Sequence, residues 1–300
     1  MPVVRPVRSV PLIGVLVVAA ACSSTAVTTT QPPPPALAAT TSTTTTPPTT
    51  TTTSTTVAPV TTTTISPYAR PAWLGTRQLP LRPDGFGEVQ PTPPELIDRQ
   101  LETIDRLPAP EGDQFDWTLS PIPDDVLARS SWEPGCPVAV DDLSYLTVSH
   151  MGFDGRFHTG EMIVDAGFGE GMVDVFRALH EARFPVESMR VTTAGAIDAP
   201  PTGDWNNTTS FVCRAATQST NWSQHAYGRA VDINPFHNPY LRGDLVIPEL
   251  ASAYTDRDDI RPGMILRDDV VTEAFGDIGW SWGGNWNTLK DWMHFSYTGR

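Results

Sequence analysis

A run of threonine and proline near the N-terminus most limits what this chain of 300 residues can fold into. Residues 23–67 consist almost entirely of Thr, Pro, Ser, Ala and Val. Such a segment has too little large apolar surface to offset the entropy lost on ordering, and its prolines keep it extended. At ~3 Å per residue, this tether could reach on the order of 100 Å. The folded part is therefore expected within residues 68–300.

Residues 1–22 have the pattern of an export signal. Arg5 and Arg8 precede an apolar stretch that is too short to span a bilayer comfortably, and small residues lead to Cys22. The sequence AAAC, followed by two serines, resembles the lipobox of bacterial lipoproteins. This resemblance implies cleavage before Cys22, lipid attachment to its thiol, and a protein anchored to the cell membrane and facing the cell wall. An ordinary cleaved signal with an incidental cysteine is the alternative.

The remaining residues are enough for one domain with a substantial core. Residues 68–132 are rich in Pro, Asp and Glu, and we expect an irregular N-terminal extension there, packed on a main domain over 133–300. The net charge of −14, without a basic cluster, argues against nucleic acid as a partner.

Two cysteines remain besides Cys22. In an exported protein, Cys136 and Cys213 are most simply a disulfide, which would stabilise the fold by roughly 4 kcal/mol in the chain-entropy model. Two unpaired buried thiols are the alternative. Neither cysteine lies in a C-x-x-C pair, so the sequence gives no support for zinc-thiolate chemistry.

Periodicity predicts a mixture of helices and strands. Helices are expected near residues 94–107, 169–185 and 270–275, and strands at 139–149, 160–164, 188–194 and 230–234, with a long loop over 235–262. Because helices and strands do not alternate regularly, we predict an α+β fold with an antiparallel sheet and flanking helices.

The histidines are the candidates for a metal site, because catalytic zinc needs three His or carboxylate ligands and one open position. The sequence HEARF at residues 180–184 begins like H-E-x-x-H, but Phe184 stands where the second histidine is needed. One other pattern fits. SQHAYGRAVD matches S-x-H-x-x-G-x-A-x-D over residues 223–232, and DWMH at 291–294 matches [E/D]-x-x-H.

These two motifs, in this order, resemble the zinc peptidases of the D-Ala-D-Ala carboxypeptidase family, over roughly residues 133–300. The segment GWSWGGNWNTLKDWMHF looks most like the branch of L-alanyl-D-glutamate endopeptidases found in endolysins. The resemblance implies the fold shared by Hedgehog and DD-peptidases, a Zn²⁺ cofactor and peptidoglycan stem peptides as substrates. It does not choose between a carboxypeptidase and an endopeptidase.

The resemblance also implies a role for each matching residue. His225, Asp232 and His294 would be the zinc ligands, and Asp291 the general base that takes a proton from water and passes it to the leaving amine. Arg214 would bind a carboxylate or carbonyl oxygen of the substrate. Much of the family has glutamate at the position of Asp291.

Elementary geometry agrees with these roles. On a strand through residues 230–234, Asp232 points away from Val231 and Ile233, and the three-residue spacing lets a single turn bring Asp291 and His294 to one side. His150, His158 and His180 are expected to be ordinary polar residues, with His237 a spare ligand or cleft residue at most. Trp280, Trp282, Trp286 and Trp292 are expected in the core and groove wall, with sugar stacking as the alternative. The alternative function is an inactive wall-binding module that keeps the fold.

Overall fold

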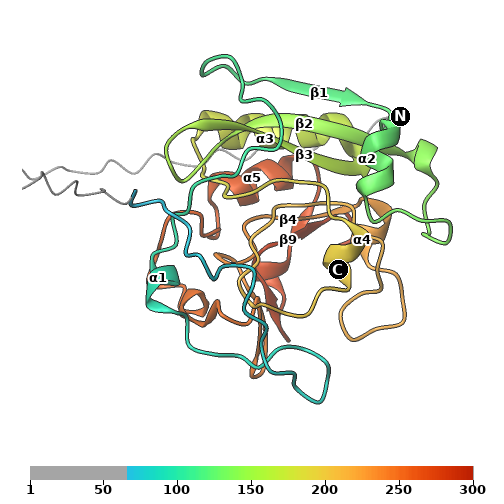
Figure 1. Cartoon of the computed structure of the whole chain (residues 1–300). Coiled ribbons are helices and arrows are strands. Elements are labelled where there is room, and N and C mark those ends of the chain that lie inside the picture. Colours follow the sequence, from blue (N-terminus) through green and yellow to red (C-terminus); the bar gives the residue numbers. More distant parts are fainter. Residues whose placement is uncertain (1–65, 300) are drawn as a thin grey trace, which may run out of the picture. The chain divides into compact units, whose positions relative to one another are not determined.

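The computed structural model describes residues 66–299, which lie within one compact unit (Figure 1). The predicted leader, with Cys22, and the predicted tether up to residue 65 lie outside the described residues. Within the described part, no helix combines the length and apolar character needed to cross a bilayer.

Short helices and small antiparallel sheets make up the fold, in agreement with the predicted α+β class. The helices are α1 (Pro94–Ile97), α2 (Asp124–Arg129), α3 (Gly169–Glu181), α4 (Ala194–Ile197) and α5 (Val270–Asp277). The strands are β1 (Trp117–Ser120), β2 (Leu143–Met151), β3 (Phe157–Asp165), β4 (Ala230–Asp232), β5 (Tyr240–Arg242), β6 (Leu245–Ile247), β7 (Ser281–Trp282), β8 (Lys290–Asp291) and β9 (His294–Ser296). The described part of the chain also has 3₁₀ turns at Val140–Asp142, Ala166–Phe168, Gln224–Tyr227, Ser252–Thr255 and Gly283–Asn285.

The largest sheet has the strand order β1-β2-β3 and is covered on both faces. Leu146 and Met162 project to one face, where the core includes side chains of α3, α5 and β9. Tyr145 and Ile163 project to the other face and pack with Val126 of α2 and its neighbours. Figure 1 shows α3 running along β2 and β3, with α5 beside it. Because both faces are covered, most residues of β2 and β3 are buried, including polar ones such as Ser149, His150 and Glu161.

Two smaller sheets carry Asp232, Asp291 and His294 of the two motifs, whereas His225 lies on a 3₁₀ turn. Their strand orders are β4-β9-β7 and β6-β5-β8, and all of their pairings are antiparallel. A two-residue turn at Trp292 and Met293 separates β8 from β9, so that one short segment contributes a strand to each sheet.

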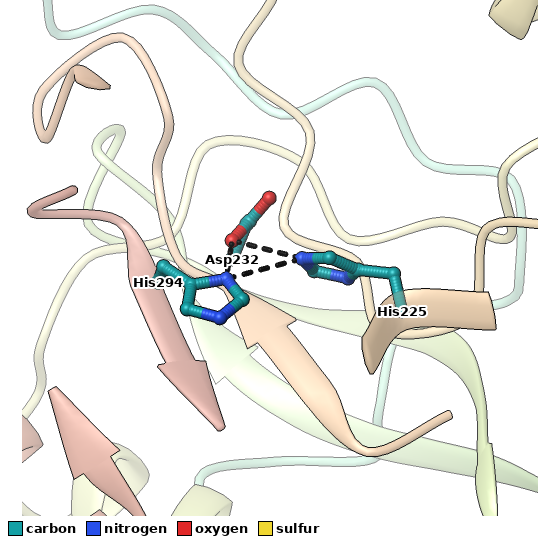
Figure 2. Close-up of side chains that lie close together, drawn as sticks. All are labelled: His225, Asp232 and His294. Carbon is teal, nitrogen blue, oxygen red and sulfur yellow. Dashed lines mark hydrogen bonds and ion pairs between the residues drawn. The ribbon is translucent and has the colours of Figure 1, made fainter. Parts of the chain in front are cut away.

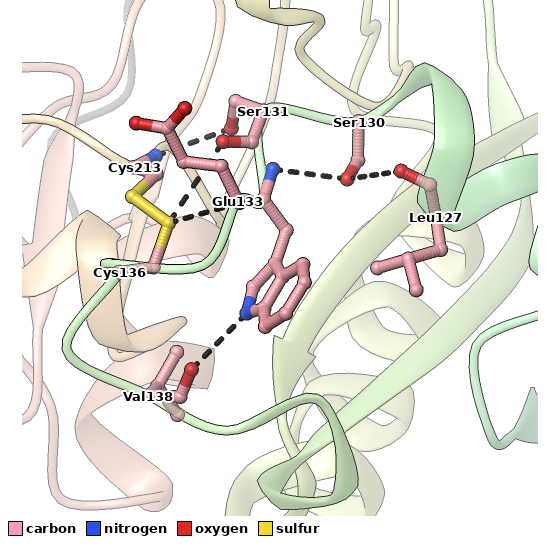
Figure 3. Close-up of a disulfide and its surroundings, with 8 residues drawn as sticks. Leu127, Ser130, Ser131, Glu133, Cys136, Val138 and Cys213 are labelled. Atoms are coloured by element: carbon pink, nitrogen blue, oxygen red, sulfur yellow. Dashed lines mark hydrogen bonds between the residues drawn. A yellow bond between two sulfur atoms is a disulfide. The ribbon is translucent and has the colours of Figure 1, made fainter.

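Cys136 and Cys213 form a disulfide, 77 residues apart in sequence, as predicted (Figure 3). The Ser131 hydroxyl accepts a hydrogen bond from the Cys213 backbone N–H at 3.1 Å, and the Trp132 indole donates to the Val138 carbonyl at 3.1 Å. The bond therefore fixes the segment that enters the first motif against the loop that follows α2.

Arg99, which is 2% exposed, binds the segment that follows α1 to the rest of the fold. Its guanidinium donates to both carboxylate oxygens of Glu187 at 2.7 and 2.8 Å and lies over the Phe236 ring at 4.4 Å. The backbone N–H of Arg99 donates to the Tyr254 hydroxyl, and its carbonyl accepts from His237. Burial alone would raise the pKa of Glu187, but the charge and hydrogen bonds of Arg99, aided by Arg70, lower that pKa to about 2.

The predicted strands at 139–149 and 160–164 correspond to β2 and β3, and the predicted helices at 169–185 and 270–275 correspond to α3 and α5. Three other predictions were wrong. The helix at 94–107 is only the single turn α1, the segment 188–194 makes one isolated bridge and not a strand, and the loop 235–262 contains the hairpin β5–β6.

Candidate metal centre

The segment that positions His225 is a single 3₁₀ turn, Gln224–Tyr227, preceded by Ser223. The Ser223 hydroxyl accepts the His225 backbone N–H at 3.3 Å. Gly228 ends the turn with φ 68°, and a Cβ there would lie 2.5 Å from the Asp165 backbone nitrogen. A side chain is excluded both by backbone conformation and by space. Gly228 therefore lets this turn press directly against the end of β3.

Asp232 and His294 face each other across β4 and β9. They are directly opposed residues of the antiparallel pair, which places their side chains on the same face. Val231 and Ile233 point into the core and are fully buried, as the alternation predicted. The fixed register of this strand pair thus sets the distance between the carboxylate and the imidazole.

His225, Asp232 and His294 form a compact triangle of donor atoms, shown in Figure 2. The distance from His225 Nε2 to His294 Nδ1 is 3.2 Å, and Asp232 Oδ1 lies 3.2 Å from the first nitrogen and 3.1 Å from the second. All three residues are buried. In residues 66–299 this is the one group of three or more His, Cys, Asp or Glu side chains that could hold a metal ion.

The donor atoms fit a small cation. Ligands at ~2.0–2.1 Å from a tetrahedral zinc lie about 3.3 Å from each other, close to the sides of this triangle. The Ser210 carbonyl lies 2.7 Å from His225 Nδ1, and because a carbonyl only accepts, it keeps the proton on Nδ1. The lone pair of Nε2 is therefore directed into the triangle.

The charge of Asp232 also suits a cation site. Burial on its own would raise the pKa of this carboxyl, but His225 and His294 hold it well below its usual range. Asp232 therefore carries a negative charge near neutral pH.

Asp291 lies beside this triangle in a different electrostatic environment. Its Oδ1 atom is buried and has no hydrogen-bond partner among the described residues. Burial, reinforced by the charge of Asp232, raises the pKa of Asp291 to about 7, although His294 and Arg214 act in the opposite direction. A carboxylate with such a pKa can both accept and release a proton near neutral pH.

Gly283 packs closely against the carbonyl oxygen and Cβ of Asp291. A Cβ at Gly283 would lie 2.6 Å from the Asp291 carbonyl oxygen and 2.9 Å from its Cβ. Trp286, which follows, is half-buried, and its ring lies 5.5 Å from that of His294. This tryptophan forms part of the wall beside the triangle, whereas Trp280, Trp282 and Trp292 belong to the core.

The structure thus brings together four of the five predicted site residues. The fifth, Arg214, donates to the Ala215 carbonyl, and its charge acts on Asp291 only as a minor influence on the pKa of that carboxyl. His237 does not join them, because its two ring nitrogens contact Asn206 and the Arg99 carbonyl. Sequence reasoning missed the Ser210 carbonyl, because no residue pattern marks a backbone carbonyl as part of a site. It also missed Tyr240, which is opposite Asp291 across β5 and β8, although the Gly-Asp pair at 243–244 marks a two-residue hairpin.

The comparisons with known proteins agree with the motifs. Residues 217–297 match the family model described as D-alanyl-D-alanine carboxypeptidase. No curated protein and no solved structure matched the chain. The matched segment contains the three residues of the triangle as well as Asp291, so this part of the chain carries the signature of the D-alanyl-D-alanine carboxypeptidase family of peptidases, and the resemblance predicted from the two motifs is confirmed.

Proposed function

We propose that this protein is a zinc metallopeptidase that hydrolyses peptidoglycan stem peptides. The observation that carries the proposal is the buried triangle of His225, Asp232 and His294 beside a carboxylate whose pKa is raised toward neutrality. The family match over residues 217–297 supports a peptidase. As part of the same proposal, the domain would have the fold shared by Hedgehog and DD-peptidase domains.

In the proposed hydrolysis, a bound metal ion and the protein side chains would have separate roles. A bound zinc ion would supply a Lewis acid and lower the pKa of water at the site. Asp291 would accept a proton from the attacking water on its buried Oδ1 and return that proton to the leaving amine. Arg214 would hold a carboxylate or carbonyl oxygen of the peptide, a task suited to a planar guanidinium.

The location is part of the proposal. The leader pattern of residues 1–22 and the Thr/Pro-rich segment 23–67 support an exported lipoprotein, anchored at Cys22 and reaching into the cell wall. Incorporation of labelled fatty acid into the wild-type chain, and its loss in Cys22→Ala, is the expected result. Export without lipid labelling would favour an ordinary signal sequence.

The first test of the site is metal content. Elemental analysis of the purified protein is expected to give about one zinc per chain, and His225→Ala is expected to lose it while keeping the wild-type circular dichroism spectrum. His180→Ala, at a histidine outside the triangle, is the matched control and should keep its zinc. A wild-type protein that holds no zinc after loading at neutral pH would contradict the proposal.

The second test is the reaction. Mass spectrometry of muropeptides digested by the zinc-loaded protein separates the two activities, because a carboxypeptidase removes one terminal alanine and an endopeptidase cleaves within the stem. Asp291→Ala should bind zinc but lose turnover by at least a hundredfold. Wild-type protein that binds zinc and peptide without cleaving any stem peptide would favour the wall-binding module.

A further inference from the structure

A second arginine, Arg242, ends β5, the strand that pairs with β8 and therefore with Asp291. β5 pairs with β8 so that Tyr240 is directly opposite Asp291. Opposed residues of antiparallel strands project from one face, and so does the residue two positions further along. Asp291, Tyr240 and Arg242 therefore share a face, while Leu241 projects from the other face and packs against the apolar core.

The pKa of the Tyr240 hydroxyl depends on two charged neighbours, Arg242 and Asp291. Burial is the main cause that raises the pKa of Tyr240, the Arg242 guanidinium opposes this by hydrogen bonding and charge, and the Asp291 carboxylate adds to the increase. The strand register makes Tyr240 a neighbour of both groups, because Arg242 lies two residues along β5 and Asp291 lies opposite on β8.

Arg242 is also bound to the loop that carries Arg214. Its Nη1 donates to Gln218 Oε1 at 2.7 Å. Gln218 lies in the loop that starts at Arg214 and is closed by a bridge between Ala215 and Trp222. One hydrogen bond thus connects the end of β5, which carries Arg242, to the loop that carries Arg214.

Neither of these two arginines has a carboxylate partner in the described part of the chain. Other arginines there, such as Arg99, Arg129 and Arg229, are within 2.7 Å of a carboxylate oxygen. Arg242 contacts the neutral amide of Gln218, and Arg214 donates to the Ala215 carbonyl. Arg242 and Arg214 therefore keep guanidinium N–H groups that no carboxylate of the described residues occupies, and these groups are free to bind an anionic ligand.

We propose that Arg242, held by Gln218 and next to Tyr240 on β5, is a second anion subsite of this active site and binds a carboxylate of the substrate in addition to the group held by Arg214. The inference rests on the proposed function and narrows its substrate class to peptides with a free carboxylate besides the C-terminal one. A guanidinium can bind such a group with two parallel hydrogen bonds, which an amidated peptide cannot accept in the same way.

The test uses two synthetic stem peptides that differ in one group, a side-branch carboxylate that is free in the first and amidated in the second. Wild-type protein is expected to show a kcat/KM about tenfold higher for the free acid, mainly through KM. Arg242→Gln should lose this preference, because the lost contact is one that substrate and transition state share. Arg267→Gln, at an exposed arginine with no contact to the site residues, is the matched control and should keep the preference.

Two results would overturn the inference while leaving the proposed function intact. One is a wild-type enzyme that cleaves both peptides equally well. The other is an Arg242→Gln variant that still prefers the free acid, or that loses activity on both peptides to the same extent.

If the wild-type protein cleaves neither peptide, the proposed function fails and calorimetric binding of the same two peptides to the zinc-loaded protein decides the subsite. Tighter binding of the free acid, lost in Arg242→Gln, would support the subsite. Equal binding of both peptides would overturn it.

Discussion

Asp232 and Asp291 show how two carboxyl groups of one site acquire different chemistry. Asp232 contacts both histidines, and its pKa lies far below the usual range, whereas the buried Oδ1 of Asp291 has no partner among the described residues and the pKa of that carboxyl is raised to about 7. One group is a permanent anion, and the other can exchange a proton near neutral pH. Motif spacing predicted which residues these are, but the pKa difference depends on burial that no local pattern reveals.

The buried Asp291 carboxylate should reduce the stability of the metal-free protein at neutral and alkaline pH. Its pKa is about 7 in the folded chain against an ordinary 3.8, so the folded state binds the proton more tightly and stability falls as pH rises through this window. We expect metal-free Asp291→Asn to be more stable than wild type at pH 8 by roughly 2–4 kcal/mol, and about equally stable at pH 3.5. Urea unfolding of chelator-treated protein at both pH values measures this, and equal stability at pH 8 would contradict it.

Gly283 is expected to control activity without contacting the metal triangle. A Cβ in Gly283→Ala would lie 2.6 Å from the Asp291 carbonyl oxygen and must push this strand away. Because small displacements of a catalytic group cost up to ~100-fold in rate, we predict a 10- to 100-fold loss of kcat with unchanged zinc content. Gly276→Ala in α5, where an added Cβ meets nothing within 4 Å, is the matched control. Wild-type turnover in Gly283→Ala would show that Asp291 tolerates the shift.

At the scale of elements, sequence patterns succeeded where local signals and packing agree. The apolar stripe of α3 and the alternation around Asp232 lie where they were predicted. The helix expected over residues 94–107 ends at Ile97, because Arg99 is pulled into the core by Glu187 and Tyr254. Such tertiary contacts override helix propensity, which amounts to a few tenths of a kcal/mol per residue.

The segment 188–194 shows a second kind of failure. Its apolar and β-branched residues are typical of a strand, but Met189 makes one bridge to Thr208, and Thr193 then caps the short helix α4. The prediction for the β5–β6 hairpin was wrong in the opposite way, because strands exist there that were not predicted. Its three-residue strands are too short for periodicity, and only the Gly243 turn, with φ 60°, marks it.

The disulfide should stabilise the element that precedes the first motif. Closing a loop of 77 residues is worth about 4 kcal/mol in the chain-entropy model, so the double variant Cys136→Ser, Cys213→Ser is expected to lose about that much stability. Because Arg214 follows Cys213 directly, KM for an anionic peptide should rise as well. Denaturant unfolding with and without reductant checks the first part, and wild-type stability after reduction would contradict it.

At the scale of the whole molecule, the extension contributes to the core. Leu79, Leu96 and Leu101 pack with Phe236 and Tyr254, and the Arg99–Glu187 ion pair lies between them and the segment that leads to the site. The division into an extension at 68–132 and a domain at 133–300 remains a prediction. Composition alone could not indicate these contacts, because an irregular segment rich in proline has no periodicity by which its buried positions can be recognised.

The Arg99–Glu187 pair should make stability depend on acid pH. The pKa of Glu187 is about 2 in the folded chain against an ordinary 4.5, so its contribution is complete above pH 4.5 and is lost as pH falls toward 2. Glu187→Gln leaves Arg99 buried without a counter-charge. We expect this variant to lose roughly 3–5 kcal/mol of unfolding free energy at neutral pH and less at pH 3. Glu181→Gln, at an exposed glutamate ending α3, is the control. Urea unfolding at pH 7 and 3 measures both, and equal losses for the two variants would contradict the assignment.

The burial of Arg99 has a consequence for how the chain could be divided. Cleavage of the peptide bond after Glu111, in an exposed and irregular stretch, would leave two fragments joined by no covalent bond. The first would still carry the arginine and leucines that complete the larger fragment's core, and the larger fragment would keep both cysteines. The two pieces should therefore co-purify and reassemble after separate synthesis, as in a split enzyme whose activity reports their association.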